Sequence, residues 1–272
     1  MNSTHFVKWY PEQWKDLNLK LDNHYMPIDC NAKMHKADGS VTVNVAIPTL
    51  GLRPQIVDTI DSFLTSTYRH TRIVVLVQEQ SEMASRLRET YRNDKRVEVI
   101  FDPNRRGWVN CINTIAKMDG HLLAVGDDVC VFRDTIEVLV AEMERIFPDG
   151  DGVLGTNHTY THRNSAHKPG WSMAFPFIGD RFINRFPGRQ VLCPDYINYG
   201  GDVELPDYAI SINRCIQVPD AKVIHFERGT MDADATSRIV REAGLPDIER
   251  YFIRQQRGLL WGKNFDLIRG TA

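Results

Sequence analysis

Cysteine is scarce in this sequence. The chain has 272 residues and only five cysteines, an odd number, and none of them forms a Cys-x-x-Cys pair. They are Cys30, Cys111, Cys130, Cys193 and Cys215. This pattern argues against a disulfide framework and against a structural zinc site, and it favours a reducing compartment.

Long apolar runs are also missing. No segment approaches the roughly 20 apolar residues that a membrane-spanning helix needs. Near the amino terminus, Trp9, Tyr10 and Trp14 stand among charged residues, which is unlike the apolar core of a signal peptide. We therefore expect a cytoplasmic protein with no integral membrane segment.

Neither sign of charge is in excess. The chain has 33 Lys and Arg against 35 Asp and Glu, for a net charge of -2, and it is 42% hydrophobic and 25% charged. This balance is typical of a soluble globular protein and gives no global electrostatic attraction to nucleic acid or to anionic membranes. The length fits one large α/β domain or two tightly joined halves.

Two common nucleotide-binding motifs are absent as well. The first predicted strand is not followed by Gly-x-Gly-x-x-Gly, and the chain has no Walker A lysine motif. The sequence therefore signals neither a dinucleotide site nor a P-loop site.

An alternation of apolar strands and amphipathic helices is present instead. The pattern predicts strands at residues 41–49, 72–77, 96–101 and 120–132, separated by helices at 53–64, 81–91 and 109–116. This order predicts an α/β fold with a doubly wound, mostly parallel central sheet. Right-handed crossovers would bring the strand ends to one edge, so that Thr49, Glu79, Asn104, Arg106, Asp127 and Asp128 converge on a crevice.

The fourth predicted strand ends in two acids. Its apolar residues stop at Gly126-Asp127-Asp128. Two carboxylates at the end of a buried strand are suited to Mg²⁺ or Mn²⁺, which prefer oxygen ligands. A polar turn that merely closes the strand is the alternative interpretation.

The second half of the chain is less regular. We expect a helix at 133–147, a short strand at 153–155, a helix from about Val203 to Asn213, a strand at 218–226, and tail helices at 235–243 and 247–260. The intervening segment contains several histidines, among them His158, His162 and His167, which we interpret as an exposed loop.

Four motifs now stand in a recognisable order. They are residues 45–49, the series Asn104 to Gly107 with Asn113, Ala116 and Gly120, residues 201–205, and residues 219–225 ending in His225. In this order they resemble the A-type-fold (GT-A) glycosyltransferases of family 2, over residues 41–131 and more loosely over 170–228.

The resemblance implies an enzyme that transfers a sugar from a nucleotide-sugar donor, with a UDP-sugar as first choice, using Mg²⁺ or Mn²⁺. Asp128 and His225 would hold the metal through a DXD-like motif, with Asp127 as a further metal or ribose contact. Donor-binding residues would be Pro48, Thr49, Glu79, Asn104, Arg106, Asn113 and Asp127. Asp202 would accept the proton of the attacking hydroxyl, which gives inversion at the anomeric carbon; its alternative role is a helix N-cap.

Four positions depart from the family pattern. Gly126 stands where the first acid of Asp-x-Asp is usual, Gln78 and Glu79 replace acids after the second strand, and Gly201 replaces a Glu before Asp202.

The resemblance also divides the chain. Residues 1–40 would form an extension, 41–131 the nucleotide-sugar half, 132–228 the acceptor half of the same domain, and 229–272 a helical tail. The acceptor would be a glycan, a lipid-linked saccharide, a protein or a hydroxymethylated DNA base. The DNA option depends on Arg181, Arg185, Arg189 and the basic residues of the tail, which would contact phosphates. A sugar-phosphate nucleotidyltransferase and a non-catalytic nucleotide-sugar-binding module are the alternative functions.

Overall fold

The computed structural model describes residues 41–160, 173–226 and 235–268, with the side chains of 158–160 left out. The predicted extension at 1–40 and the loop positions His162 and His167 lie outside the described residues.

One eight-stranded sheet forms the centre of the protein, in the order β3-β2-β1-β4-β7-β6-β8-β5. Its first four strands are β3 (Val97–Asp102), β2 (Thr71–Gln78), β1 (Val43–Thr49) and β4 (His121–Ala124), and neighbours among them run parallel. Strands that are covered on both faces are apolar along their whole length, which is why the sequence pattern located this part well. The predicted doubly wound, mostly parallel sheet is confirmed.

The other four strands are β7 (Pro176–Ile178), β6 (Val153–Tyr160), β8 (Cys215–His225) and β5 (Val129–Val131). β7 runs antiparallel to β4 and β6, β6 and β8 run parallel, and β5 runs antiparallel to β8. The strand predicted at 120–132 is therefore wrong as a single element. It is two strands at different places in the sheet, joined by a turn at residues 125–128 that contains the two acids.

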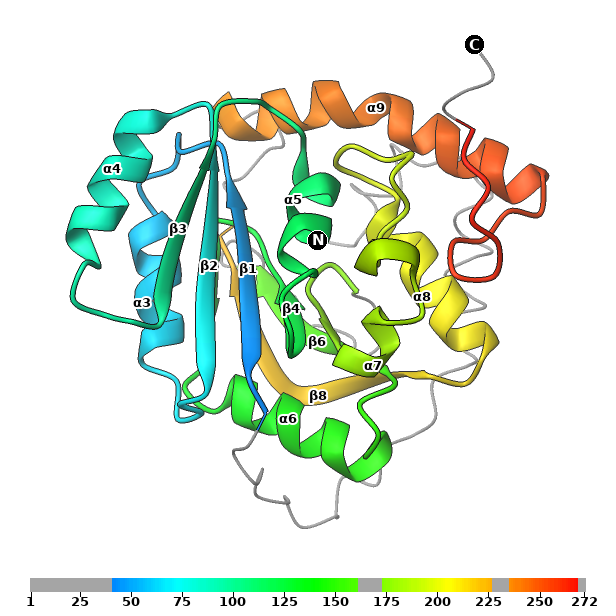
Figure 1. Cartoon of the computed structure of the whole chain (residues 1–272), viewed down its shortest axis with the longest axis horizontal. Coiled ribbons are helices and arrows are strands. Elements are labelled where there is room, and N and C mark those ends of the chain that lie inside the picture. The colour runs from blue at the N-terminus through cyan, green and yellow to red at the C-terminus, as the bar shows by residue number, and fades with distance from the viewer. Residues whose placement is uncertain (1–40, 161–172, 227–234, 269–272) are drawn as a thin grey trace.

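Helices cover both faces of this sheet (Figure 1). Along β2, Ile73, Val75 and Val77 pack with α3 (Ile56–Leu64), α4 (Ser81–Thr90) and α6 (Thr135–Ile146). Val74 and Leu76 point to the opposite core, which contains residues of α5 (Trp108–Ile115), α7 (Asp180–Ile183), α8 (Gly201–Ser211) and α9 (Ala235–Gln256). Alternate residues of one strand thus supply two separate cores.

The tail forms one long helix, α9, rather than the two helices predicted from sequence. Gly244 and Pro246 stand between the two predicted helices, and both lie inside α9. A Cβ on Gly244 would lie 2.3 Å from Cδ2 of Tyr199, so this glycine permits close packing and does not end the helix. Figure 1 shows α9 extending along one end of the sheet, past β1 to β3 and α5 and on to α8.

Two compositional expectations concern the described residues as a whole. Within the described ranges, no helix combines the length and the apolar character required to cross a membrane. Cys111, Cys130, Cys193 and Cys215 are free thiols, and Cys30 lies outside the described residues.

Candidate functional site

The two acids lie in the turn between β4 and β5. Asp127 is 4% exposed and Asp128 is 8% exposed. A Cβ added to Gly126 would lie only 2.8 Å from Oδ1 of Asp128. Any side chain at position 126 would therefore press on this carboxylate, which gives a steric reason for the glycine that replaces the usual first acid.

Asp127 is held by the end of β1. Thr49 Oγ1 donates to Oδ2 of Asp127 at 2.6 Å, and Arg53 Nη1 donates to Oδ1 at 2.8 Å. These contacts form because β1 and β4 pair in parallel, so their carboxyl ends meet. Burial raises the pKa of Asp127 even though Arg53 and Thr49 act in the opposite direction.

Asp128 is held from the other half of the sheet. β5 pairs with β8 so that Val129 lies opposite His225, and the imidazole Nε2 is 3.3 Å from Oδ1 of Asp128. Phe175 packs edge-on against the imidazole ring, with 5.2 Å between ring centroids. Burial acts to raise the pKa of Asp128, but the hydrogen bond to His225 and the charge of Arg53 outweigh it and hold that pKa below its usual value.

Arg53 is a residue of the candidate site that the sequence pattern did not reveal. Its Nη1 lies 2.8 Å from Oδ1 of Asp127 and 2.6 Å from Oδ2 of Asp128, and its Nη2 donates to Ser237 Oγ of α9 at 2.8 Å. In the sequence this arginine only precedes a proline at the expected start of a helix. The available signal was its position just after the first strand, beside the end of the fourth.

Gln78 and Glu79, at the end of β2, contact the loop that follows β3. Gln78 Oε1 accepts from the backbone N–H groups of Arg106 and Gly107 at 2.8 and 3.0 Å. Glu79, which adopts a left-handed conformation with φ of 64°, pairs with Arg105 at 2.5 Å. Gln78 therefore shapes the loop that follows β3.

Asn104 and Arg106, two further predicted donor-binding residues in this loop, both contact Asp102. Arg106 pairs with Asp102 at 2.9 Å, and Asn104 Nδ2 donates to the same carboxylate at 3.1 Å. Both residues are exposed and follow the end of β3.

Pro48 and Asn113 are more deeply placed. Pro48 is buried in β1 opposite Leu76 of β2. The side-chain amide of Asn113 donates to the carbonyl oxygen of Leu192 at 2.8 Å and accepts from its N–H at 2.9 Å. Asn113 thus joins α5 to the segment near residue 192, which is a structural role.

Asp202 lies in the first turn of α8 and is half-buried. The N-cap of this helix is Gly200, with φ of 85° and no side-chain cap hydrogen bond, so Asp202 is not the N-cap. Burial raises the pKa of Asp202 to about 6. A carboxyl group with such a pKa can take up a proton near neutral pH.

Trp108 connects the acid turn to the segment that leads into α8. Its indole Nε1 donates to the carbonyl oxygen of Val125 at 3.3 Å, and its backbone N–H donates to Asn198 Oδ1 at 2.9 Å. Gly107 makes the approach possible, because a Cβ there would lie 2.4 Å from Cγ2 of Ile197.

α9 makes a second connection between the same two parts. Ser237 contacts Arg53, and the carbonyl oxygen of Val240 accepts from Asn198 Nδ2 at 3.3 Å. Three residues of helix correspond to about 4.5 Å, so the two contacts are close together. The acid pair and the segment before Asp202 therefore border the same region.

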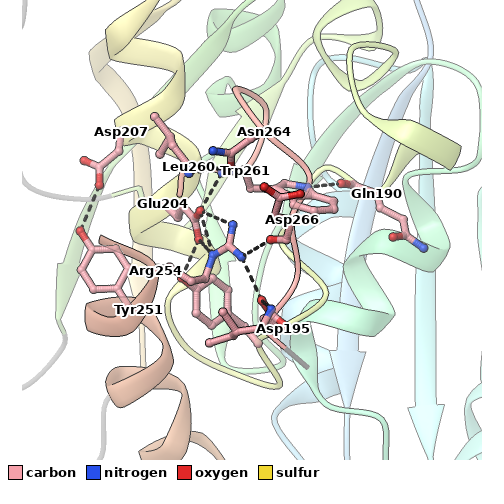
Figure 2. Close-up of polar contacts among 12 residues, drawn as sticks. Gln190, Asp195, Glu204, Asp207, Tyr251, Arg254, Leu260, Trp261, Asn264 and Asp266 are labelled. Carbon is pink, nitrogen blue, oxygen red and sulfur yellow. Dashed lines mark hydrogen bonds and ion pairs between the residues drawn. The ribbon is translucent and has the colours of Figure 1, made fainter. Parts of the chain in front are cut away.

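The start of α8 is fixed by two buried charged groups. One carboxylate oxygen of Asp247 accepts from the backbone N–H groups of Ile197, Asn198 and Tyr199 at 2.7 to 3.0 Å. Figure 2 shows the second group, Arg254, which reaches Glu204 of α8 and Asp195. The prediction that basic residues of the tail face phosphates is therefore wrong for Arg254, which is fully buried.

The basic candidates outside the tail, Arg181, Arg185 and Arg189, already have acidic or carbonyl partners. Arg185 pairs with Asp151, Arg189 pairs with Asp180 at 2.6 Å, and Arg181 lies 3.7 Å from Asp149. Arg189 also donates to the carbonyl oxygens of Ala116 and Met118. These contacts weaken the argument for a phosphate-tracking surface.

The acid turn offers part of the donor set of a divalent-cation site. Two carboxylates and an imidazole are oxygen and nitrogen ligands of the kind that Mn²⁺ and Mg²⁺ accept. The cationic Nη1 of Arg53 already lies between the two acids, which shows that positive charge is favoured there. Across the described ranges, however, no three His, Cys, Asp or Glu side chains are arranged closely enough to form a complete metal cluster.

Three solved structures share the fold. PcManGT from Pyrobaculum calidifontis, in complex with GDP-Man and Mn²⁺, matches with a TM-score of 0.58 and 16% identity over 93% of this chain and 73% of its own. TarS 1-349 of S. aureus matches with a TM-score of 0.55 and 15% identity over 68% of this chain and 60% of its own. GalNAc-T7 with UDP, GalNAc and Mn²⁺ matches with a TM-score of 0.54 and 15% identity over 82% of this chain and 56% of its own.

At these identities the structural likeness concerns the fold, and it confirms the expected A-type glycosyltransferase architecture. The chain spans less than two thirds of the TarS and GalNAc-T7 chains. No curated protein has significant sequence similarity to it. The family model for glycosyl transferase family 2 matches residues 44–196, which is more than half of the chain. The chain therefore belongs to glycosyl transferase family 2.

Proposed function

We propose that this protein is an inverting, metal-dependent glycosyltransferase that moves a sugar from a nucleotide-sugar donor to a hydroxyl group. The observation that carries the proposal is the contact of Asp128, in the turn between β4 and β5, with His225 of β8, next to Asp127, which Thr49 of β1 holds. The ligands of the similar structures support the donor class, since PcManGT is in complex with GDP-Man and TarS 1-349 with UDP-GlcNAc.

The reaction exchanges one bond at the anomeric carbon for another. The bond to the diphosphate oxygen breaks, the acceptor oxygen forms the new bond on the opposite face, and the acceptor proton passes to a base. A bound Mg²⁺ or Mn²⁺ would supply countercharge to the departing diphosphate. Asp128 and His225 would hold that cation, with Asp127 kept in place by Thr49.

Asp202 is the proposed base. Its half-buried carboxyl has a pKa of about 6, so it is mostly ionised at neutral pH and is still basic enough to accept a proton. Asp202 lies in the first turn of α8, shortly after Asn198. Trp108 and Val240 of α9 both contact Asn198 and so connect this segment to the turn that contains Asp127 and Asp128.

The donor-side contacts are proposed more broadly. Thr49, Glu79, Asn104 and Arg106 lie at neighbouring strand ends, where a base, ribose and diphosphate would bind. Pro48 and Asn113 would support this wall from within the core. The acceptor is a hydroxyl compound, and the engagement of Arg185, Arg189 and Arg254 by acids makes a saccharide, lipid-linked glycan or protein a better candidate than DNA.

Donor hydrolysis in the absence of acceptor tests the proposal. The protein would be incubated with Mn²⁺ or Mg²⁺ and UDP-, GDP-, CMP- and dTDP-sugars, and release of nucleoside diphosphate measured. We expect metal-dependent release that Asp128→Asn abolishes and the exposed control Asp134→Asn retains. Formation of a nucleotide sugar from a nucleoside triphosphate and a sugar phosphate would instead indicate a nucleotidyltransferase. Failure to bind any donor would indicate a non-catalytic module.

A further inference from the structure

We infer that Arg53 and the divalent cation compete for the same two carboxylates, so that the guanidinium must leave Asp127 and Asp128 before the metal binds. The inference rests on the proposed metal site and adds a residue to it. Arg53 would act as an internal cation that is exchanged for the metal.

The geometry carries the first step. Nη1 of Arg53 lies within hydrogen-bonding distance of one oxygen of each acid, at 2.8 and 2.6 Å, and so sits between the two side chains. The remaining oxygens face elsewhere, since Oδ2 of Asp127 accepts from Thr49 and Oδ1 of Asp128 contacts His225. Asp128, the proposed ligand, and Asp127, the proposed further contact, each have one oxygen taken by Arg53, so a cation that binds both acids competes with the guanidinium.

Distance and charge exclude simultaneous occupancy. A cation that took these oxygens as ligands would lie next to the Nη1 that now contacts them. The cation and the guanidinium are both positive and would repel each other. The acids beside them are only 4% and 8% exposed, so water screens this repulsion weakly. The acid pair can therefore hold the guanidinium or the metal at this point, but not both.

The same arginine links the acid pair to α9. Nη2 donates to Ser237 Oγ at 2.8 Å, while Nη1 contacts the acids. The Arg53 side chain is therefore held on two sides, by the acids and by Ser237, and only 16% of it is exposed. Metal binding would break the acid contacts and alter the Ser237 contact, which makes Ser237 a second residue that influences metal affinity.

Binding of Mn²⁺ alone, followed by calorimetry and by the electron paramagnetic resonance signal of free Mn²⁺, tests the inference without any turnover. Arg53→Gln removes the competing charge and should bind Mn²⁺ about tenfold more tightly than the parent protein. Arg53→Lys keeps a cation and should remain near the parent value. Arg92→Gln, at an exposed arginine that pairs with Glu89 just after α4, is the matched control and should change nothing.

Ser237→Ala is a second variant, which can be measured if Arg53→Gln does not fold. It removes one anchor of the guanidinium and leaves every charge in place, so it should tighten Mn²⁺ binding about twofold to threefold. Circular dichroism would establish that each variant is folded.

The outcomes separate this inference from the proposed function. Tighter Mn²⁺ binding in Arg53→Gln, lost again when Asp128→Asn is added, supports the exchange. Equal or weaker binding in both Arg53→Gln and Ser237→Ala overturns it, while metal-dependent donor hydrolysis by the parent protein would leave the proposed function standing. If neither the parent protein nor Arg53→Gln binds Mn²⁺, the exchange is wrong, and absence of donor hydrolysis as well would reject the proposed function.

Discussion

Arg254 of α9 and Glu204 of α8 form a buried ion pair in which three hydrogen bonds join the two side chains. Nε donates to both carboxylate oxygens at 3.1 Å and Nη2 donates to Oε1 at 2.9 Å. The arginine is fully buried and Glu204 is 3% exposed (Figure 2). Tyr196 and the backbone N–H of Trp261 also donate to Glu204, and Nη1 of Arg254 donates to Asp195 at 2.9 Å.

Removing one partner of this pair should destabilise the fold strongly. Arg254→Met leaves the carboxylates of Glu204 and Asp195 buried without their cation, and we expect a loss of about 3–5 kcal/mol in the free energy of unfolding. Urea denaturation followed by circular dichroism measures it. Arg257→Met, at an exposed position of the same tail, should change stability by less than about 0.5 kcal/mol. Equal effects of the two substitutions would contradict the structural role of Arg254.

Asp247 should matter for stability and for the position of Asp202. Asp247→Ala leaves three backbone N–H groups of residues 197–199 without their acceptor, and we expect a loss of at least about 2 kcal/mol. The measurement is again urea denaturation, with Glu249→Ala as a control on the same helix. Donor hydrolysis should fall as well, because this segment leads directly into α8. An Asp247→Ala protein as stable as the parent would show that the three contacts are dispensable.

His225 should set the metal requirement. His225→Asn removes the imidazole beside Asp128, and we expect the Mn²⁺ concentration for half-maximal donor hydrolysis to rise more than about tenfold. Titrating Mn²⁺ at saturating donor measures this shift. The exposed His70→Asn is the control. An unchanged Mn²⁺ requirement would remove His225 from the proposed ligand set.

Asp202 should affect transfer and leave donor binding intact. Asp202→Asn cannot accept the acceptor proton, so we expect the rate of transfer to fall by about 10²–10⁴-fold. Calorimetry should find the donor bound with little change in affinity. The comparison is Asp220→Asn, an exposed residue of β8. Loss of donor binding together with transfer would place Asp202 on the donor side.

The pH dependence of transfer follows from the raised pKa of Asp202. A base works in its ionised form, so activity should rise as pH increases through about 6 and should fall as pH decreases through the same value. Initial rates between pH 5 and 8 would show this limb, provided that donor and metal remain saturating. A profile flat across this range would be inconsistent with Asp202 as the base.

The contribution of Asp202 to the free energy of unfolding changes with pH in the opposite direction from that of most carboxylates. The folded pKa of Asp202 lies above its ordinary value of 3.8, so the native state holds this proton more tightly than the unfolded chain does. The contribution of Asp202 therefore favours folding at acid pH and is lost as pH rises through about 6. Comparing the parent protein with Asp202→Asn by urea denaturation at pH 5 and pH 8 isolates this contribution.

The parallel half of the sheet could be predicted because β1, β2 and β4 are almost wholly buried and the strands are bounded by helices with clear amphipathic patterns. The division of residues 120–132 into β4 and β5 could not, since apolar residues continue on both sides of the turn and burial alone does not show where a strand leaves its partner. α9 was divided wrongly because glycine and proline are statistical breakers, whereas here Gly244 accommodates Tyr199.

The candidate site was predictable to a similar extent. Strand order brings Thr49 next to Asp127, and the family-like order of motifs brings His225 next to Asp128. Arg53 was not predictable as a partner of the acids, because a single arginine after a strand carries no pattern of its own. Arg254 was misjudged because its acids, Glu204 and Asp195, are remote in sequence and only the folded chain brings them together.

The position of α9 has a practical consequence for anyone who shortens this protein. One helix supplies Ser237 to Arg53, Asp247 to the segment before Asp202, and Arg254 to the interior beneath α8. A fragment trimmed to residues 44–196, the limits of the family match, would discard all three along with β8 and His225. Expression boundaries, fusion partners and proteolytic tags should therefore be placed beyond residue 268, because the recognisable family region is smaller than the unit that can fold and bind.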